Sequence, residues 1–239
     1  IIISFKNMTY IRSRLCLKPL LNVEFLLKIL RDRQVTHFFS SEDYGEHVAR
    51  RLGAKDIRVD QARQVHPISA TRIRNSLFDN REHVPSLVYR DLIRKVVFLG
   101  APSSGKSTIA EACAKEFSTN FMPEYGREYW EANNIQRRLT PEQLLDIAVG
   151  HREREDRLLL DSRDVFFIDT DATTTAVFAD YYHQSVSTDL QVLVCDCEKR
   201  YDLVFLCLPD IPYDDTEDRS GEANREEFHQ RVVDGLRAS

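Results

Sequence analysis

The sequence predicts an α/β protein with two domains that meet near residue 92. Short apolar runs, of strand length, alternate with stretches of helical pattern, which is typical of parallel α/β sheets. Residues 1–94 hold 17 Lys and Arg against 10 Asp and Glu, whereas residues 95–239 hold 16 against 28. A length of 239 residues fits two modest domains, and the step in charge favours placing them at residues 1–92 and 93–239.

The apolar patterns place the elements of the first domain. We expect strands at residues 1–5, 35–39 and 57–59. We expect one helix at residues 20–33, a second that ends near residue 52, and a third at residues 86–93. The last of these helices would join the two domains, because no Gly- or Ser-rich linker lies between them. In such α/β sheets, ligands bind at the carboxyl ends of the strands.

Composition narrows the classes of protein that this chain can represent. No stretch reaches membrane-spanning length, and residues 1–3 are too few for a signal peptide. The five cysteines form neither a C-x-x-C pair nor a zinc-finger spacing, so we expect reduced, mostly buried thiols in a cytoplasmic protein. The arginines of the first domain are scattered among carboxylates, so a phosphate-bearing small molecule is the expected partner and nucleic acid is not. The oligomeric state, including a homo-oligomer, is left open.

A phosphate-binding loop stands at the start of the second domain. The segment G-A-P-S-S-G-K-S follows an apolar run at residues 96–99 and precedes a helical pattern. Gly100 and Gly105 allow the backbone N–H groups to face phosphate, Lys106 would reach the β- and γ-phosphates, and Ser107 would hold Mg²⁺. A plain Gly- and Ser-rich turn would have to match all four fixed positions by chance. The predicted ATP-binding residues are Gly100, Ser103, Ser104, Gly105, Lys106, Ser107 and Thr108.

A second apolar run, at residues 165–168, ends in Asp169 within the segment I-D-T-D, which Thr173 to Thr175 follow. Four apolar residues that end in Asp are typical of a Walker B strand, so we expect Asp169 to hold Mg²⁺ together with Ser107. Asp171 lies two residues later. It either binds substrate hydroxyls and accepts their proton or caps the following helix, and the two roles are compatible.

Two further stretches could complete a phosphoryl-transfer site. In M-P-E-Y-G-R-E, Glu124 would meet the hydroxyl that is phosphorylated and Arg127 would balance phosphate charge, unless the segment is an ordinary charged helix start. The acidic segment 209–224 contains Arg219 and ends before Arg225. These arginines would close over the γ-phosphate as part of a lid, or would only pair with neighbouring carboxylates.

Other charged stretches are read as structural. Thr140 to Gln143 has the pattern of a capping box with Pro141 at the first helical position. The run at residues 151–157 alternates in charge, and we expect it to form a solvent-exposed helix face.

The first domain carries S-S-E-D-Y-G and later I-S-A-T-R-I-R. Ser69 and Thr71 suit the start of a helix, where an anion would also meet Arg72 or Arg74, although a capped basic helix explains the residues equally. In this order the two segments resemble the nucleotidyltransferases that make NAD from nicotinamide mononucleotide. The resemblance implies that Ser69, Thr71 and Arg74 bind ATP phosphates. The H-x-G-H motif of that family is missing, so we expect an incomplete Rossmann-like domain with little or no adenylyl transfer.

The motifs of residues 95–239 resemble the ribosylnicotinamide kinase domain of the NadR-type bifunctional NAD-biosynthesis proteins, in which an adenylyltransferase precedes a P-loop kinase. E-Y-G-R with I-D-T-D carries most of this resemblance. It implies phosphorylation of the 5′-hydroxyl of nicotinamide riboside, with ATP and Mg²⁺, to nicotinamide mononucleotide. Because residue 239 follows soon after the acidic segment, we expect the kinase domain to lack its C-terminal end. The implied catalytic residues are Lys106, Glu124, Arg127, Asp171, Arg219 and Arg225.

Two alternatives remain at this stage. The acceptor could be another nucleoside or small metabolite, because the sequence shows the phosphate-binding residues more clearly than a base pocket. Tyr125, Tyr129 and Trp130 are candidates for stacking on a pyridine ring, although such residues beside a helix are more often core. The chain could also be a regulatory module that binds a nucleoside triphosphate and has no kinase activity.

Overall fold

The computed structural model divides the chain into two compact units, which are described separately. The larger unit contains residues 1–14 and 84–239, and the smaller unit contains residues 15–83. These units differ from the expected domains, because the N-terminal strands and the helix at residues 86–92 belong to the larger unit. The residues that the structure describes are 3–5, 8–13, 27–28, 30, 33–133, 139–213 and 224–238.

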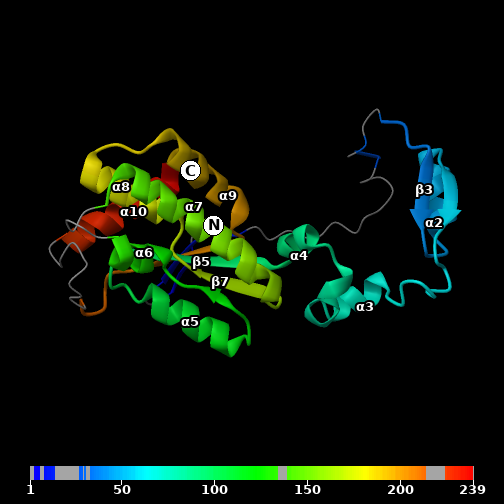
Figure 1. Ribbon diagram of the computed structural model, residues 1–239, viewed down its shortest axis with the longest axis horizontal. Helices are drawn as coiled ribbons and strands as arrows, with labels where there is room; N and C mark the ends of the chain where they lie inside the picture. Colours follow the sequence, from blue (N-terminus) through cyan, green and yellow to red (C-terminus); the bar gives the residue numbers. More distant parts are fainter. Residues whose placement is uncertain are drawn as a thin grey trace. The chain divides into compact units, whose positions relative to one another are not determined.

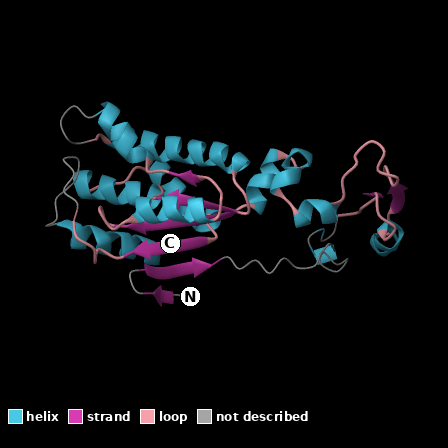
Figure 2. Cartoon of the chain, turned by 90° about the horizontal axis from the view of Figure 1, so that it is seen from below, coloured by secondary structure: helices cyan, strands magenta, loops and turns pink. Residues whose placement is uncertain are grey.

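The larger unit is built on a sheet of strand order β1-β2-β8-β5-β7-β6 (Figure 2). Its four parallel strands are β5 (Arg94–Gly100), β6 (Phe121–Met122), β7 (Val165–Asp169) and β8 (Leu203–Cys207). The parallel α/β arrangement predicted from the alternating pattern is therefore confirmed. Two antiparallel strands that the sequence analysis did not assign to this sheet, β1 (Ile3–Phe5) and β2 (Met8–Ser13), extend it beyond β8.

Helices cover both faces of this sheet, as the near-continuous apolar sequence of β5 requires. On one face, Val96, Phe98 and Phe167 form a buried cluster with Ala110 and Ala114 of α5 (Lys106–Glu116). On the other side lie α7 (Pro141–Leu158), α8 (Ala172–His183) and α9 (Thr188–Arg200) (Figure 1). The P-loop helix and the long helix α7 thus lie on opposite faces of the sheet.

The remaining helices of the larger unit are α4 (Ser86–Leu92), α6 (Tyr125–Asn133) and α10 (Arg225–Ala238), with a 3-10 turn η2 (Leu159–Asp161) after α7. Helix α4 confirms the prediction for residues 86–93. The capping box is also present: the Thr140 hydroxyl accepts from the Gln143 N–H, and the Gln143 side chain accepts from the Thr140 N–H. Among the described residues, no helix combines the length and the apolar character that crossing a membrane requires.

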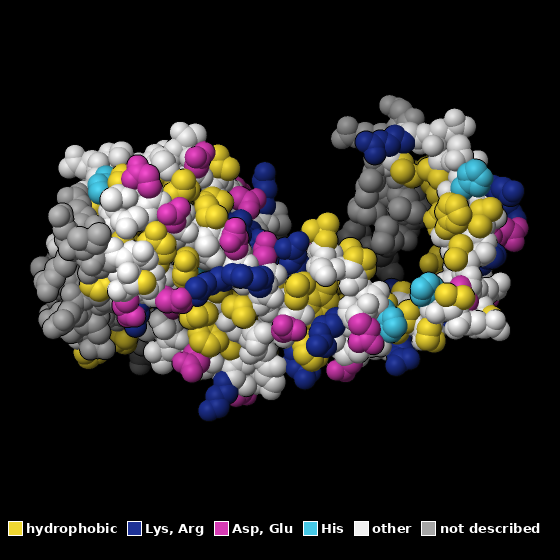
Figure 3. Space-filling view, viewed as in Figure 1, with side chains coloured by type: hydrophobic (Ala, Val, Ile, Leu, Met, Phe, Trp, Pro, Cys, Tyr) yellow, Lys and Arg dark blue, Asp and Glu magenta, His cyan; other side chains and the backbone are white. Residues whose placement is uncertain are grey.

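The described part of the smaller unit, from residue 33 onward, contains one parallel strand pair and three short helical segments. Strands β3 (His37–Ser40) and β4 (Lys55–Arg58) flank α2 (Gly45–Leu52), close to the predicted positions. Helix α3 (Ala70–Asn75) and the 3-10 segment η1 (Phe78–His83) follow. The predicted helix at residues 20–33 falls mostly outside the described residues. Hydrophobic side chains gather on the visible surface of this unit (Figure 3), and the exposed ones include Phe39, Tyr44, Val59 and Val65.

The described cysteines are all free thiols. Cys197 and Cys207 are buried, as expected, whereas Cys113 is half-buried and Cys195 is exposed. Cys16 lies outside the described residues.

Candidate active site

The loop between β5 and α5 has the geometry of a phosphate cradle. Gly100 and Gly105 both have positive φ angles, of 142° and 81°, which residues with a Cβ atom rarely adopt. A Cβ atom at Gly100 would also lie 2.5 Å from the carbonyl oxygen of Cys207 on the neighbouring strand β8. Only glycine therefore fits at the first position of this loop, and the backbone curls as the sequence predicts.

Two polar side chains of the loop, Ser104 and Lys106, are buried. Lys106 is buried, and its Nζ donates a hydrogen bond to the Ala101 carbonyl at 2.8 Å. The Ser104 hydroxyl is buried and has no partner among the described residues. Ser107 and Thr108 are exposed on the first turn of α5, whose N-terminus carries a partial positive charge. This arrangement fits a polyphosphate, because it combines a glycine cradle, a buried ammonium group and the N-terminus of a helix.

Asp169 ends β7 beside this loop, as predicted. It is fully buried, and neither carboxylate oxygen has a hydrogen-bond partner of ordinary geometry among the described residues. Burial and the nearby negative charge of Glu124 raise its pKa to about 6, against the opposing effects of Lys106, Ser107 and His151. A buried carboxylate without a hydrogen-bond donor is costly unless a cation or proton accompanies it.

The donor set of this corner fits Mg²⁺. Carboxylate and hydroxyl oxygens are the ligands that Mg²⁺ takes from proteins, together with water and phosphate oxygens. In the described part of the chain, no three His, Cys, Asp or Glu side chains cluster closely enough to hold a metal by themselves. A cation held by Asp169 and Ser107 would therefore share its coordination with a bound phosphate.

A cavity adjoins the phosphate loop and contains most of the predicted acceptor residues. Its polar walls include Lys106, Glu124, Arg127 and Asp171. The rest is mainly apolar, and the contributing side chains are Trp130, Leu139, Leu144, Ile147, Phe178, Tyr182 and Phe228. Such a cavity, apolar with a few convergent polar groups, is the usual form of a small-molecule site.

Of the three aromatic residues proposed for stacking, only Trp130 lines this cavity. The ring of Tyr125 instead lies 4.1 Å from the guanidinium of Arg154, and the Tyr129 hydroxyl donates to Asp146. The aromatic residues that α8 and α10 supply to the wall were not predicted. Two of them, Phe178 and Phe228, have ring centroids 4.5 Å apart.

Asp171 caps α8 and also lines the cavity. Its Oδ1 accepts a hydrogen bond from the Thr173 N–H at 2.8 Å and so caps α8, which confirms the capping interpretation. The residue also lines the cavity, where burial raises its pKa against the opposing hydrogen bonds of Thr173 and Cys197. A carboxyl group with a raised pKa beside an acceptor pocket is suited to receiving a proton.

The charged residues near the cavity mouth differ in what they contact. Arg127 lies 3.8 Å from Glu124, one helical turn away, and is 43% exposed. Arg225 is buried at the start of α10, and its two terminal nitrogens donate to the carbonyls of Ile211 and Ser103 at 2.7 Å. Arg225 thus ties the chain after β8 to the phosphate loop. Arg219 falls outside the described residues.

The other predicted phosphate-binding residues belong to the smaller unit. The Ser69 hydroxyl accepts from the Arg72 N–H at 3.0 Å and caps α3, as predicted. Arg74 donates to the Thr71 hydroxyl at 3.3 Å. Ser69 and Thr71 also line a groove. The described contacts of these residues are those of a capped basic helix.

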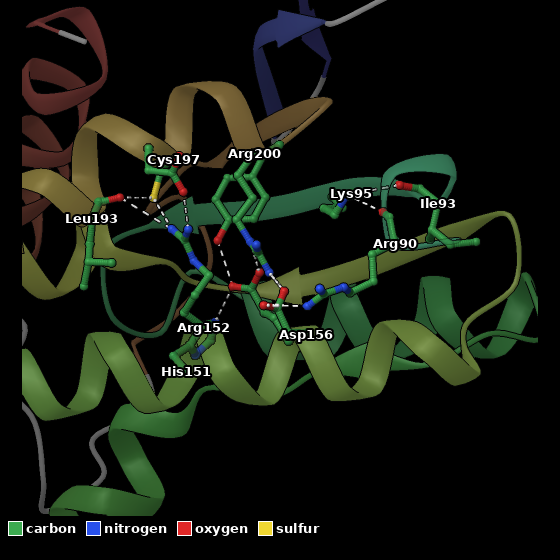
Figure 4. Close-up of polar contacts among 12 residues, drawn as sticks. Arg90, Ile93, Lys95, His151, Arg152, Asp156, Leu193, Cys197 and Arg200 are labelled. Atoms are coloured by element: carbon green, nitrogen blue, oxygen red, sulfur yellow. Dashed lines mark hydrogen bonds and ion pairs between the residues drawn. The ribbon is translucent and has the colours of Figure 1, made fainter. Parts of the chain in front are cut away.

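The prediction that residues 151–157 form a solvent-exposed face is wrong for two members. His151 and Glu155 are buried, because this side of α7 packs against α9 (Figure 4). The Glu155 carboxylate accepts from Arg200 Nε at 2.7 Å and from the Tyr201 hydroxyl at 2.8 Å. Burial alone would raise its pKa, but His151 and Arg200 outweigh it and lower the pKa to about 2.

Comparison with known proteins agrees with this architecture. The chain is 33% identical over 197 residues to the trifunctional NAD biosynthesis/regulator protein NadR of Escherichia coli (strain K12), a match covering 81% of this chain and 47% of that protein. The Salmonella typhimurium NadR is 32% identical over 213 residues, covering 85% and 50%. The chain therefore spans about half the length of the curated relatives it matches, to which it is homologous.

Two solved structures of NadR proteins are similar in fold to this chain. A crystal structure of NadR protein in complex with NR has a TM-score of 0.57 and 27% identity, over 85% of this chain and 58% of that one. Another, in complex with NAD and AMP-PNP, has a TM-score of 0.54 and 24% identity, over 84% and 58%. The sequence profile of a family described as AAA domain matches residues 95–239, the part that contains the phosphate loop and Asp169. By that match, this chain belongs to the AAA domain family of P-loop proteins.

Proposed function

We propose that the larger unit phosphorylates a nucleoside hydroxyl with ATP and Mg²⁺, and that the acceptor is nicotinamide riboside. One observation carries this proposal: the phosphate loop and the carboxyl groups of Glu124 and Asp171 line one cavity whose other walls are largely apolar. A phosphate donor on the loop and a nucleoside in the cavity would meet beside these carboxyl groups. The product would be nicotinamide mononucleotide.

Each residue on the donor side has a role that phosphoryl transfer requires. Lys106 and the loop N–H groups would neutralise the β- and γ-phosphates, and Asp169 with Ser107 would hold Mg²⁺. When bound, Mg²⁺ supplies positive charge to the phosphate oxygens during transfer. The transition state is loose, so most of the rate enhancement would come from positioning and from these fixed charges.

On the acceptor side, Glu124 or Asp171 would orient the 5′-hydroxyl and receive its proton. Arg127 and Arg219 would stabilise the charge of the transferred group. Arg225 would support the same step, since it holds both Ile211 and Ser103 and so fixes the base of the acidic segment against the loop.

The choice of nicotinamide riboside rests on relatives. The solved NadR structure of 27% identity is a complex with NR, and the curated relatives are NAD biosynthesis proteins. The sequence contains no H-x-G-H, so we propose little or no adenylyl transfer by residues 1–92.

Replacement of Asp171 by Asn tests the acceptor side. Asn is as good an N-cap as Asp, so α8 should keep its start and the melting temperature should change little. Loss of the carboxylate should lower kcat with nicotinamide riboside by about tenfold to a hundredfold, because the hydroxyl is no longer aligned or deprotonated. A coupled ADP-release assay measures the rate, and thermal unfolding measures the stability.

Asp189→Asn is a matched control, because Asp189 stands in the first turn of α9 and does not line the cavity. Its kcat should equal that of the wild type. An unchanged kcat in the Asp171 variant would remove that residue from the proposed mechanism. ATP turnover that is insensitive to every nucleoside would contradict the kinase assignment itself.

A further inference from the structure

Thr174 and His151 are two of the buried polar residues that line the acceptor cavity and have no role in the mechanism above. Thr174 Oγ1 is buried and has no hydrogen-bond partner among the described residues. His151 is 5% exposed and its ring lines the same cavity. Leaving a buried polar group without a partner costs folding free energy, so groups of this kind usually meet a ligand or water.

His151 is oriented by a carboxylate behind it. Its Nε2 lies 3.3 Å from Glu155 Oε1, one helical turn further along α7. The alignment falls outside that of an ordinary hydrogen bond, yet the short distance keeps the two groups in electrostatic contact. Because Glu155 is ionised, it favours a proton on the facing Nε2 atom. Nδ1 is then the nitrogen available to a molecule in the cavity.

Glu155 does not need His151 to satisfy its charge. Arg200 and the Tyr201 hydroxyl already donate to its two oxygens at 2.7 and 2.8 Å. Arg200 also donates to Asp156, which in turn pairs with Arg90 at 2.9 Å, so the carboxylate sits in a fixed framework of charges. A residue that only filled this helix face could be apolar, as its neighbours Leu144 and Ile147 are.

We propose that His151, held by Glu155, is an acceptor-binding residue, and that Thr174 is its partner on the opposite helix. Nδ1 of His151 accepts a hydrogen bond from an O–H or N–H group of the acceptor, and the Thr174 hydroxyl contacts a second polar atom of it. Glu155 is a positioning residue that fixes the ring. This inference rests on the proposed kinase function and identifies the class of acceptor: a polar, donor-bearing molecule with an apolar face.

Two substitutions at one position separate the two nitrogens of the ring. In His151→Asn, the amide can replace Nδ1 but does not reach Glu155, whereas in His151→Gln the amide can replace Nε2 and loses the group facing the cavity. We expect the KM for nicotinamide riboside to rise about tenfold in His151→Gln, the loss of one hydrogen bond, and less than threefold in His151→Asn. The KM for ATP should stay within about twofold in both.

His229→Gln is the matched control, since His229 is also buried, on α10, and does not line the cavity. Its KM values should equal those of the wild type, whatever its melting temperature. Equal KM increases in the Asn and Gln variants, or an increase only in the Asn variant, would overturn the inference while leaving the kinase assignment intact. A wild-type protein that does not phosphorylate nicotinamide riboside would overturn both.

Discussion

Replacement of Lys106 by Ala should lower kcat for phosphoryl transfer by about 100-fold to 1,000-fold. This is the effect of removing one preorganised charge or hydrogen-bond donor at a site where charge develops. Lys106 is buried within the loop, and its ammonium group is already held at the Ala101 carbonyl, so little reorganisation is needed when phosphate binds. Steady-state assays with ATP, Mg²⁺ and nicotinamide riboside measure the change.

The matched control lies on the same helix. Lys115 is exposed in the last turn of α5, where its charge is far from the loop, and Lys115→Ala should keep the wild-type kcat. Circular dichroism of both variants checks that α5 and the sheet are intact. A folded Lys106 variant with unchanged turnover would rule out the phosphate loop as the donor site.

Replacement of Glu155 by Ala should destabilise the larger unit by about 3–5 kcal/mol, the usual cost of removing one partner from a buried ion pair. Among the described residues, the substitution leaves Asp156 as the remaining carboxylate partner of Arg200, and it removes the acceptor of the Tyr201 hydroxyl. Urea unfolding gives the difference in free energy. The exposed neighbour Glu153→Ala should change it by less than about 0.5 kcal/mol. Equal effects of the two substitutions would show that the buried contacts do not stabilise this unit.

The lowered pKa of Glu155 should make the free energy of unfolding depend on pH. Its pKa falls from an ordinary 4.5 to about 2 on folding, so the stabilisation is fully present above pH 4.5 and is lost as the pH falls toward 2. The difference in unfolding free energy between the wild type and Glu155→Ala should therefore be constant from pH 5 to pH 8 and should shrink below pH 4.5. A difference that grows on acidification would contradict the assignment of Glu155 as an ionised group.

Local sequence signals were enough to predict the centre of the site. The loop from Gly100 to Ser107 depends on glycine conformation and on a strand and helix next to it in the chain, so its sequence specifies its shape. The same holds for Asp169 at the end of an apolar strand and for the cap formed by Ser69. Each of these features involves residues within about ten positions of one another.

Features that depend on distant partners were not predicted. Glu155 reads as a solvated charge in its own helix, and its burial depends on Arg200, which is 45 residues away. The position of β2 beside β8 requires pairing across nearly the whole chain. The part of the cavity wall that α10 supplies also depends on contacts between segments far apart in the sequence. One local signal was available for His151, which continues the helical spacing of Leu144 and Ile147 on the buried side of α7.

The most direct test of the central claim is to identify the product of the wild-type protein. Incubation with ATP, Mg²⁺ and nicotinamide riboside should give nicotinamide mononucleotide, in which the 5′-oxygen of the riboside carries the phosphate. Phosphorus NMR and mass spectrometry should find this product in a one-to-one ratio with ADP. The Lys106→Ala protein should form both products about 100-fold to 1,000-fold more slowly. Release of ADP with inorganic phosphate alone, or phosphorylation only of a different acceptor, would contradict the proposed function.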